Sequence, residues 1–133
     1  MKFLIAGLGS IGRRHLNILK ELEQDDIILY RTHQSTLDDE ALAGIPVYID
    51  LRDALALKPD AVIVANPTSL HMDVAIPAAE AGCHILLEKP ISDDISHVAK
   101  LRKAAEKSGS RILVGFQFRY HPTLNKAREL INE

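Results

Sequence analysis

The first fourteen residues constrain the fold of this chain more than any other stretch. An apolar run suited to a buried strand, residues 2–6, is followed at once by the turn Gly7-Leu8-Gly9-Ser10-Ile11-Gly12, and residues 13–23 have a helical pattern. A strand, a G-x-G-x-x-G turn and a helix in this order are typical of a dinucleotide-binding unit. Other tight loops also use three glycines, so the flanking strand and helix carry this interpretation.

Each glycine of the turn has its own steric role in such a unit. Gly7 allows the chain to turn tightly, Gly9 leaves room for a pyrophosphate to approach the backbone, and Gly12 lets the helix pack closely on the strand. The unpaired N–H groups at the helix start and the positive end of the helix dipole favour a bound diphosphate.

Strands and helices alternate through the rest of the chain. Apolar runs predict strands at 2–6, 27–30, 46–49, 61–65, 83–87 and 111–116, and helical patterns lie at 13–23, 36–43, 51–57, 68–81, 94–108 and 123–133. This alternation favours the α/β class, with an open, doubly wound parallel sheet of the Rossmann type in three layers and a single domain. We expect the strand order 3-2-1-4-5-6, which places ligands at the carboxyl ends of the strands.

Apolar side chains recur at helical spacing in three of the predicted helices. In the first helix we expect Ile11, Leu16, Leu19 and Leu22 to face the core. The helix before Gly109 carries Ile95, Val98, Leu101 and Ala105 at this spacing, and the last helix has Leu124, Ala127, Leu130 and Ile131 on one face. We also expect Asp50, and either Asp93 or Asp94, to start the helices that follow them.

The composition limits the partners and the setting of the protein. The net charge is −2, and no apolar run approaches the roughly 20 residues of a membrane span, so we expect neither a nucleic-acid nor a membrane partner. The single cysteine, Cys83, and the lack of a signal-peptide pattern indicate a reducing cytoplasm. The six histidines show no metal-ligand spacing, so no metal site is predicted.

The end of the second predicted strand indicates which dinucleotide is bound. NAD sites usually carry Asp or Glu there, whereas this chain has Arg31 and Thr32, with no acid before Asp38. A guanidinium can bind a 2′-phosphate through two hydrogen bonds, so we expect NADP to be preferred, with NAD as the second candidate. Alternatively, Arg31 is a solvated loop residue or stacks on the adenine.

The segment Glu88-Lys89-Pro90 directly follows an apolar strand, where a ligand would lie. Proline holds Lys89 in an extended backbone. The Lys89–Pro90 bond can be cis or trans, and we expect trans as the default state. The ammonium group can hydrogen-bond a substrate hydroxyl or carbonyl oxygen and stabilise negative charge as a hydride moves. Lys89 is therefore the candidate catalytic residue. The alternative is an ordinary Glu–Lys pair on a surface loop.

Four motifs stand in order along the chain, at residues 7–12 (GLGSIG), 66–71 (NPTSLH), 81–90 (AGCHILLEKP) and 115–122 (GFQFRYHP). Together they resemble the Gfo/Idh/MocA oxidoreductase family, which includes glucose-fructose oxidoreductase and inositol dehydrogenase. The resemblance runs through essentially the whole chain, and Glu-Lys-Pro with its upstream Asn-Pro and His partner is more specific than the glycine turn. One departure is Asn66, where family members often carry threonine.

The resemblance implies a role for each matching residue. The pyrophosphate would be held by Gly7, Gly9, Ser10, Ile11 and Gly12, and the cofactor would be lined along the fourth strand by Asn66, Pro67, Thr68 and His71. Glu88 would approach the nicotinamide ribose, Lys89 would contact the reacting hydroxyl, and Gln117 and Arg119 would border the nicotinamide. Simpler roles are a helix cap for Thr68, a first-turn position for His71 and an anchor of the last helix for Arg119.

The family also has a second, α+β domain, which supplies an acid–base histidine and most substrate contacts. We expect residues 1–120 to be the dinucleotide-binding domain and residues 121–133 a helix leading toward that absent domain. The full-length protein would be an NAD(P)-dependent oxidoreductase acting on a sugar, polyol or related small molecule, whereas this chain alone would bind cofactor and catalyse little.

Two other functions are compatible with the same sequence. One is a free-standing NAD(P)-binding or sensing module without catalysis, and the other is an interaction module with a vestigial nucleotide site. We also expect a homo-oligomer, because the loss of a partner domain would expose apolar surface.

Overall fold

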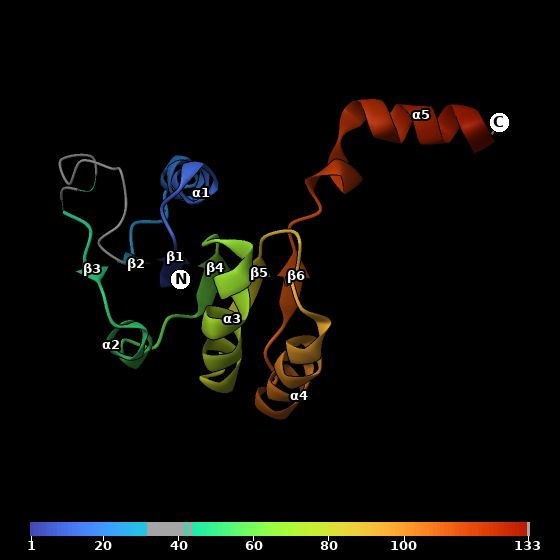
Figure 1. Cartoon of the computed structure of the whole chain (residues 1–133). Helices are drawn as coiled ribbons and strands as arrows, with labels where there is room; N and C mark the ends of the chain where they lie inside the picture. Colours follow the sequence, from blue (N-terminus) through green and yellow to red (C-terminus); the bar gives the residue numbers. More distant parts are fainter. Residues whose placement is uncertain (32–41, 43, 133) are drawn as a thin grey trace.

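One parallel sheet organises the residues that the computed structural model describes, which are 1–31, 42 and 44–132. Its strands are β1 (Phe3–Ala6), β2 (Ile27–Tyr30), β3 (Val47–Tyr48), β4 (Ala61–Val64), β5 (His84–Leu87) and β6 (Ile112–Val114). They stand in the order β3-β2-β1-β4-β5-β6 and all pair in parallel, so the predicted order is confirmed (Figure 1). The helix expected at 36–43 lies outside the described residues, apart from Leu42.

Helices cover both faces of the sheet, but unequally. The face that carries α1 (Ser10–Glu21) has one hydrophobic cluster, and the opposite face has a second cluster beneath α2 (Leu51–Ala56), α3 (His71–Glu80) and α4 (Val98–Ser108) (Figure 1). The remaining helical elements are η2 (Thr68–Leu70), η3 (Ile95–His97), η4 (Gln117–Tyr120) and α5 (Pro122–Asn132). Cys83 belongs to the second cluster, and burial raises the pKa of its thiol.

The carboxyl ends of the central strands meet at one edge of the sheet. Ala6 of β1 is level with Val64 of β4, which in turn is level with Leu87 of β5. The ladder continues one residue further, because Glu88 N donates to the Val64 carbonyl oxygen at 3.0 Å. The glycine turn, the segment after β4 and the segment Glu88-Lys89-Pro90 therefore share this edge.

Asp50 and Asp94 start their helices as predicted. Asp50 Oδ1 accepts a hydrogen bond from Arg52 N at 2.7 Å, and Asp94 Oδ1 accepts one from Ser96 N at 2.8 Å. The backbone and hydroxyl hydrogen bonds from Ser96 hold the pKa of Asp94 below its ordinary value. Both carboxylates satisfy N–H groups that have no partner within the helix.

Some side chains predicted to face the core are exposed. In α1, Leu16 and Leu19 are buried as predicted, but Ile11 is 41% and Leu22 is 63% exposed. Ile11 lies in the first turn, beyond the end of β1, and Leu22 follows the last residue of the helix, so neither packs on the sheet. Ile95 is 85% exposed because it belongs to the 3₁₀ turn η3, whose tighter repeat turns it away from the apolar face of α4.

The chain leaves the sheet after β6. Figure 1 shows α5 standing apart from the sheet, and no residue of this helix is buried. Leu130 and Ile131 are 58% and 82% exposed. The predicted helix is confirmed, and its apolar side chains do not pack on the core of the described structure.

Candidate functional site

The glycine turn is as tight as its sequence predicts. Gly7 has a φ of +90°, and a Cβ placed on it would lie 2.6 Å from the Cα of Asn66. A Cβ placed on Gly12 would lie 2.0 Å from the carbonyl oxygen of Gly7. Because these neighbours are backbone atoms, neither position has room for a side chain, and the start of α1 is held directly against the turn.

The start of α1 offers unpaired backbone donors. Gly9 is the N-cap residue, and none of the described side chains caps the helix. Gly9 and Ser10 are exposed, and a Cβ placed on Gly9 would meet no atom within 4 Å. Open space therefore lies beside the N–H groups of the first turn, at the positive end of the helix dipole, and this arrangement suits a diphosphate.

Arg31 follows β2 at the same edge of the sheet. Gly7 N donates to the carbonyl oxygen of Tyr30 at 2.9 Å, so the glycine turn is next to the end of β2. Arg31 N donates to the carbonyl oxygen of Tyr48 at 3.1 Å, and the residue is partly exposed. The backbone of Arg31 thus lies one residue beyond the strand end that the turn contacts, while Thr32 lies outside the described residues.

Glu88 is held by a residue that sequence analysis did not select. His15 Nε2 lies 2.8 Å from Glu88 Oε1, and the two side chains are only 19% and 12% exposed. The other carboxylate oxygen of Glu88 accepts from Lys89 N at 3.3 Å. The sequence signal that could have identified His15 is its position three residues after Gly12, on the part of α1 next to the strand ends. Nothing local, however, pairs it with a residue 73 positions away.

Lys89 lies exposed at the same edge. Its side chain forms no hydrogen bond or ion pair with the rest of the described chain, so the ammonium group is available to a ligand. The Lys89–Pro90 peptide bond is cis, so the expected trans bond is wrong. Proline makes this state accessible because its tertiary amide has only a small preference for trans.

The segment after β4 contains a polar atom without a partner. Asn66 Nδ2 donates to the carbonyl oxygen of Leu70 at 2.9 Å, but its Oδ1 is buried and accepts no hydrogen bond from any described residue. Pro67 is exposed and Thr68 is partly exposed, and η2 has no side-chain cap, so Thr68 does not act as one.

His71 lies behind this segment and not on its surface. The residue is 1% exposed, and both ring nitrogens face carbonyl oxygens. Nε2 lies 3.0 Å from the Asn66 oxygen, and Nδ1 lies 3.0 Å from that of Pro90 and 3.3 Å from that of Ile91. The ring therefore has no polar atom left to contact a cofactor directly.

Gln117 and Arg119 lie on η4, the exposed turn that follows β6. The structure brings them to the carboxyl side of the sheet, because Gly115 N continues the ladder by donating to the Leu87 carbonyl oxygen at 2.8 Å. Within the described chain, neither side chain is hydrogen-bonded to the glycine turn or to Lys89.

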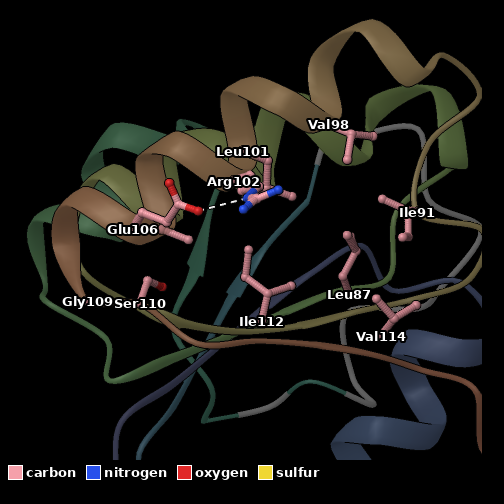
Figure 2. A pocket seen from close by; sticks show the side chains of 11 residues that line it. Leu87, Ile91, Val98, Leu101, Arg102, Glu106, Gly109, Ser110, Ile112 and Val114 are labelled. Atoms are coloured by element: carbon pink, nitrogen blue, oxygen red, sulfur yellow. Dashed lines mark hydrogen bonds and ion pairs between the residues drawn. The ribbon is translucent and has the colours of Figure 1, made fainter.

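An apolar cavity of about 440 Å³ lies between α4 and the strands β5 and β6 (Figure 2). Leu87, Leu101 and Ile112 line it, and Figure 2 shows the ion pair of Arg102 and Glu106 at its rim, with Nε 2.8 Å from Oε1. None of the predicted site residues lines this cavity.

The described side chains supply hydrogen-bonding groups and charges at the sheet edge. They contain no group of three His, Cys, Asp or Glu residues placed to hold a metal ion. None of the described helices is both long enough and apolar enough to span a membrane.

Comparison with known proteins agrees with this geometry. Residues 1–116 match the family described as an oxidoreductase family with an NAD-binding Rossmann fold. The chain is 29% identical over 133 residues to an inositol 2-dehydrogenase of Corynebacterium glutamicum, covering 96% of this chain and 40% of that protein. It is 33% identical over 90 residues to a D-xylose 1-dehydrogenase (NADP(+)) of Haloferax volcanii, covering 66% of this chain and 28% of that protein.

A similar solved structure is the WlbA dehydrogenase of Bordetella pertussis in complex with NADH and UDP-GlcNAcA. It matches with a TM-score of 0.85 and 29% identity, over 99% of this chain and 42% of that protein. The chain spans about two fifths of the length of the inositol 2-dehydrogenase and of the WlbA dehydrogenase.

Proposed function

This chain belongs to the Gfo/Idh/MocA oxidoreductase family, and on that premise we propose that it is the cofactor-binding part of a nicotinamide-dependent dehydrogenase or reductase. In the whole protein, a hydride would pass between the nicotinamide and a carbon that bears the hydroxyl of a sugar, polyol or related compound. One observation carries the proposal: the glycine turn and Lys89 lie at the same edge of the sheet, after strands that are joined in register through β4.

The residues at this edge fit a dinucleotide. Gly7, Gly9, Ser10, Ile11 and Gly12 would hold the pyrophosphate, because the first turn of α1 has unpaired donors and open space beside them. The buried Oδ1 of Asn66 lacks a partner and would accept a hydrogen bond from the ligand. Pro67 and Thr68 would line the cofactor beside it, and Gln117 and Arg119 would border the nicotinamide.

Lys89 and Glu88 would act at the nicotinamide end, where the bound cofactor supplies the hydride acceptor or donor. Lys89 would hydrogen-bond the substrate oxygen and stabilise its negative charge as the hydride moves. Glu88 would accept hydrogen bonds from the nicotinamide ribose, with its carboxylate oriented by His15. The availability of the Lys89 ammonium group supports this assignment.

We also propose a domain arrangement for the whole protein. Residues 1–120 would form the dinucleotide-binding domain, and α5 would lead toward a substrate domain that carries the acid–base group. The lack of buried residues in α5 and the greater length of the relatives support this arrangement.

The exposed apolar side chains after β6 support a homo-oligomer, and the buried single cysteine supports a reducing cytoplasm.

The preferred cofactor would be NADP, because Arg31 stands where an NAD site usually has an acid. Its guanidinium would bind the 2′-phosphate of the adenosine ribose, and Thr32 would lie beside it. A hydrogen bond between charged groups contributes about 1.5–3 kcal/mol, which is about ten- to a hundredfold in affinity.

Calorimetric titration of NADPH and NADH into the chain tests the proposal. Arg31→Asp should weaken NADPH binding about ten- to a hundredfold and NADH binding far less. Arg128→Asp, on the exposed helix α5, is the matched control and should change neither affinity. Equal losses for the two cofactors would contradict the NADP preference, and failure of the unaltered chain to bind either would contradict the function itself.

A further inference from the structure

His71 is the one polar side chain among the described residues that is fully buried. It lies at the start of α3, and its ring spans the space between two turns that follow neighbouring strands. One turn contains Asn66 and the other contains Pro90, and each presents a carbonyl oxygen 3.0 Å from a different ring nitrogen. A single side chain therefore joins the segment after β4 to the segment after β5.

The chemistry of these contacts differs from that of core packing. Carbonyl oxygens only accept hydrogen bonds, so each contact needs a proton on the facing nitrogen, and a neutral imidazole donates from one nitrogen only. An apolar side chain of similar size would fill the same volume but could donate to neither carbonyl oxygen. Leucine would therefore preserve packing here while removing the link between the two turns.

The segment Glu88-Lys89-Pro90 is held on both sides of its lysine. Before Lys89, the carboxylate of Glu88 is bonded to His15 of α1. After it, the carbonyl groups of Pro90 and Ile91 both lie within hydrogen-bonding distance of His71 Nδ1. Lys89, between these fixed points, has a side chain without a partner in the described chain, so its direction is set by the backbone on either side.

We propose that His71 is a positioning residue for Lys89. It acts through the Pro90 carbonyl, which it holds against the turn after β4, and it does not touch the cofactor or the substrate. The catalytic role of Lys89 rests on the proposed function. The link between His71 and the backbone of residues 88–92 is independent of it. A displacement of about 1 Å in a catalytic group can lower turnover about a hundredfold, so such a link matters for the chemistry.

Two substitutions separate the two contacts of the ring. In His71→Asn the side-chain amide reaches the position of Nδ1, so it can donate to the Pro90 carbonyl but not to that of Asn66. In His71→Gln the amide reaches the position of Nε2, so it can donate to the Asn66 carbonyl but not to that of Pro90. His71→Leu keeps the volume and removes both donors.

Hydrogen–deuterium exchange of the 133-residue chain, read over residues 88–92, tests the proposal. His71→Leu and His71→Gln should exchange about tenfold faster there than the unaltered chain, the factor that one hydrogen bond supplies, and His71→Asn should exchange at nearly the unaltered rate. Melting temperatures of the two amide variants should be similar. If exchange over 88–92 is the same in all three variants, or follows the melting temperature alone, the positioning role is wrong.

Titration of NADH and NADPH into the same samples distinguishes this result from the proposed function. If the unaltered chain binds neither cofactor but the exchange pattern appears, the proposed function fails and the link between His71 and the lysine segment stands. If the chain binds cofactor and the exchange pattern is absent, the positioning role alone is overturned. Should His71→Leu fail to fold, the contrast between the Asn and Gln variants decides the question.

Discussion

The region around β1 and β4 differs from the region from β6 to α5 in how far its apolar side chains are buried. In the first, Leu4 is fully buried, and the glycine turn approaches Asn66 so closely that no side chain fits between them. In the second, Leu113, Phe118 and Ile131 are 58%, 64% and 82% exposed. Side chains are therefore closely packed around the edge where a dinucleotide would bind, whereas the last part of the chain keeps apolar side chains at the surface.

The largest difference between the two regions should appear in the free energy of unfolding. Leu4→Ala removes a side chain from the centre of the sheet and should lower it by about 2–5 kcal/mol, through lost burial and the cavity left behind. Leu130→Ala, the same substitution on exposed α5, should change it by less than about 0.5 kcal/mol. Urea unfolding of both variants measures the contrast, and similar losses would mean that α5 packs on the domain in solution.

A smaller effect should separate two glycines within the first region. Gly12→Ala forces a Cβ against the Gly7 carbonyl oxygen and should lower the free energy of unfolding by about 1–3 kcal/mol. Gly9→Ala places its Cβ in open space, so stability should stay within about 0.5 kcal/mol while affinity for NADH falls. Denaturation and titration of both variants check this. Unchanged NADH affinity in Gly9→Ala would mean that the diphosphate does not lie at this turn.

Regular elements and their order could be predicted because local signals determine them. Strictly apolar runs such as 61–65 indicate strands buried on both faces, and the alternation of strands and helices leaves few arrangements. Asp50, and one of Asp93 and Asp94, could be predicted as helix starts because a cap depends only on its nearest neighbours, and the structure shows that Asp94 is the second cap. Helical periodicity failed for Ile11 and Leu22, since spacing gives the face of a helix but not where the helix overhangs the sheet.

The candidate site could be predicted only in part. The glycine turn and Glu88-Lys89-Pro90 carry recognisable spacing, and the sheet order was enough to bring them to one edge. The contacts of His15 with Glu88 and of His71 with Pro90 join residues 73 and 19 positions apart, and no local pattern specifies such pairs. Sequence reasoning therefore assigned His71 to the cofactor, whereas its burial favours a supporting role.

A map of amide chemical shifts in the ¹⁵N-labelled chain during titration with NADPH locates the bound diphosphate directly. We expect the diphosphate to bind to the backbone donors that start α1, at the edge shared with Lys89. The largest shift changes should therefore occur at the amides of residues 9–12, with further changes at 88 and 89 and little change in α5. Changes confined to the residues around the apolar cavity between α4 and β6, with none at 9–12, would contradict this expectation.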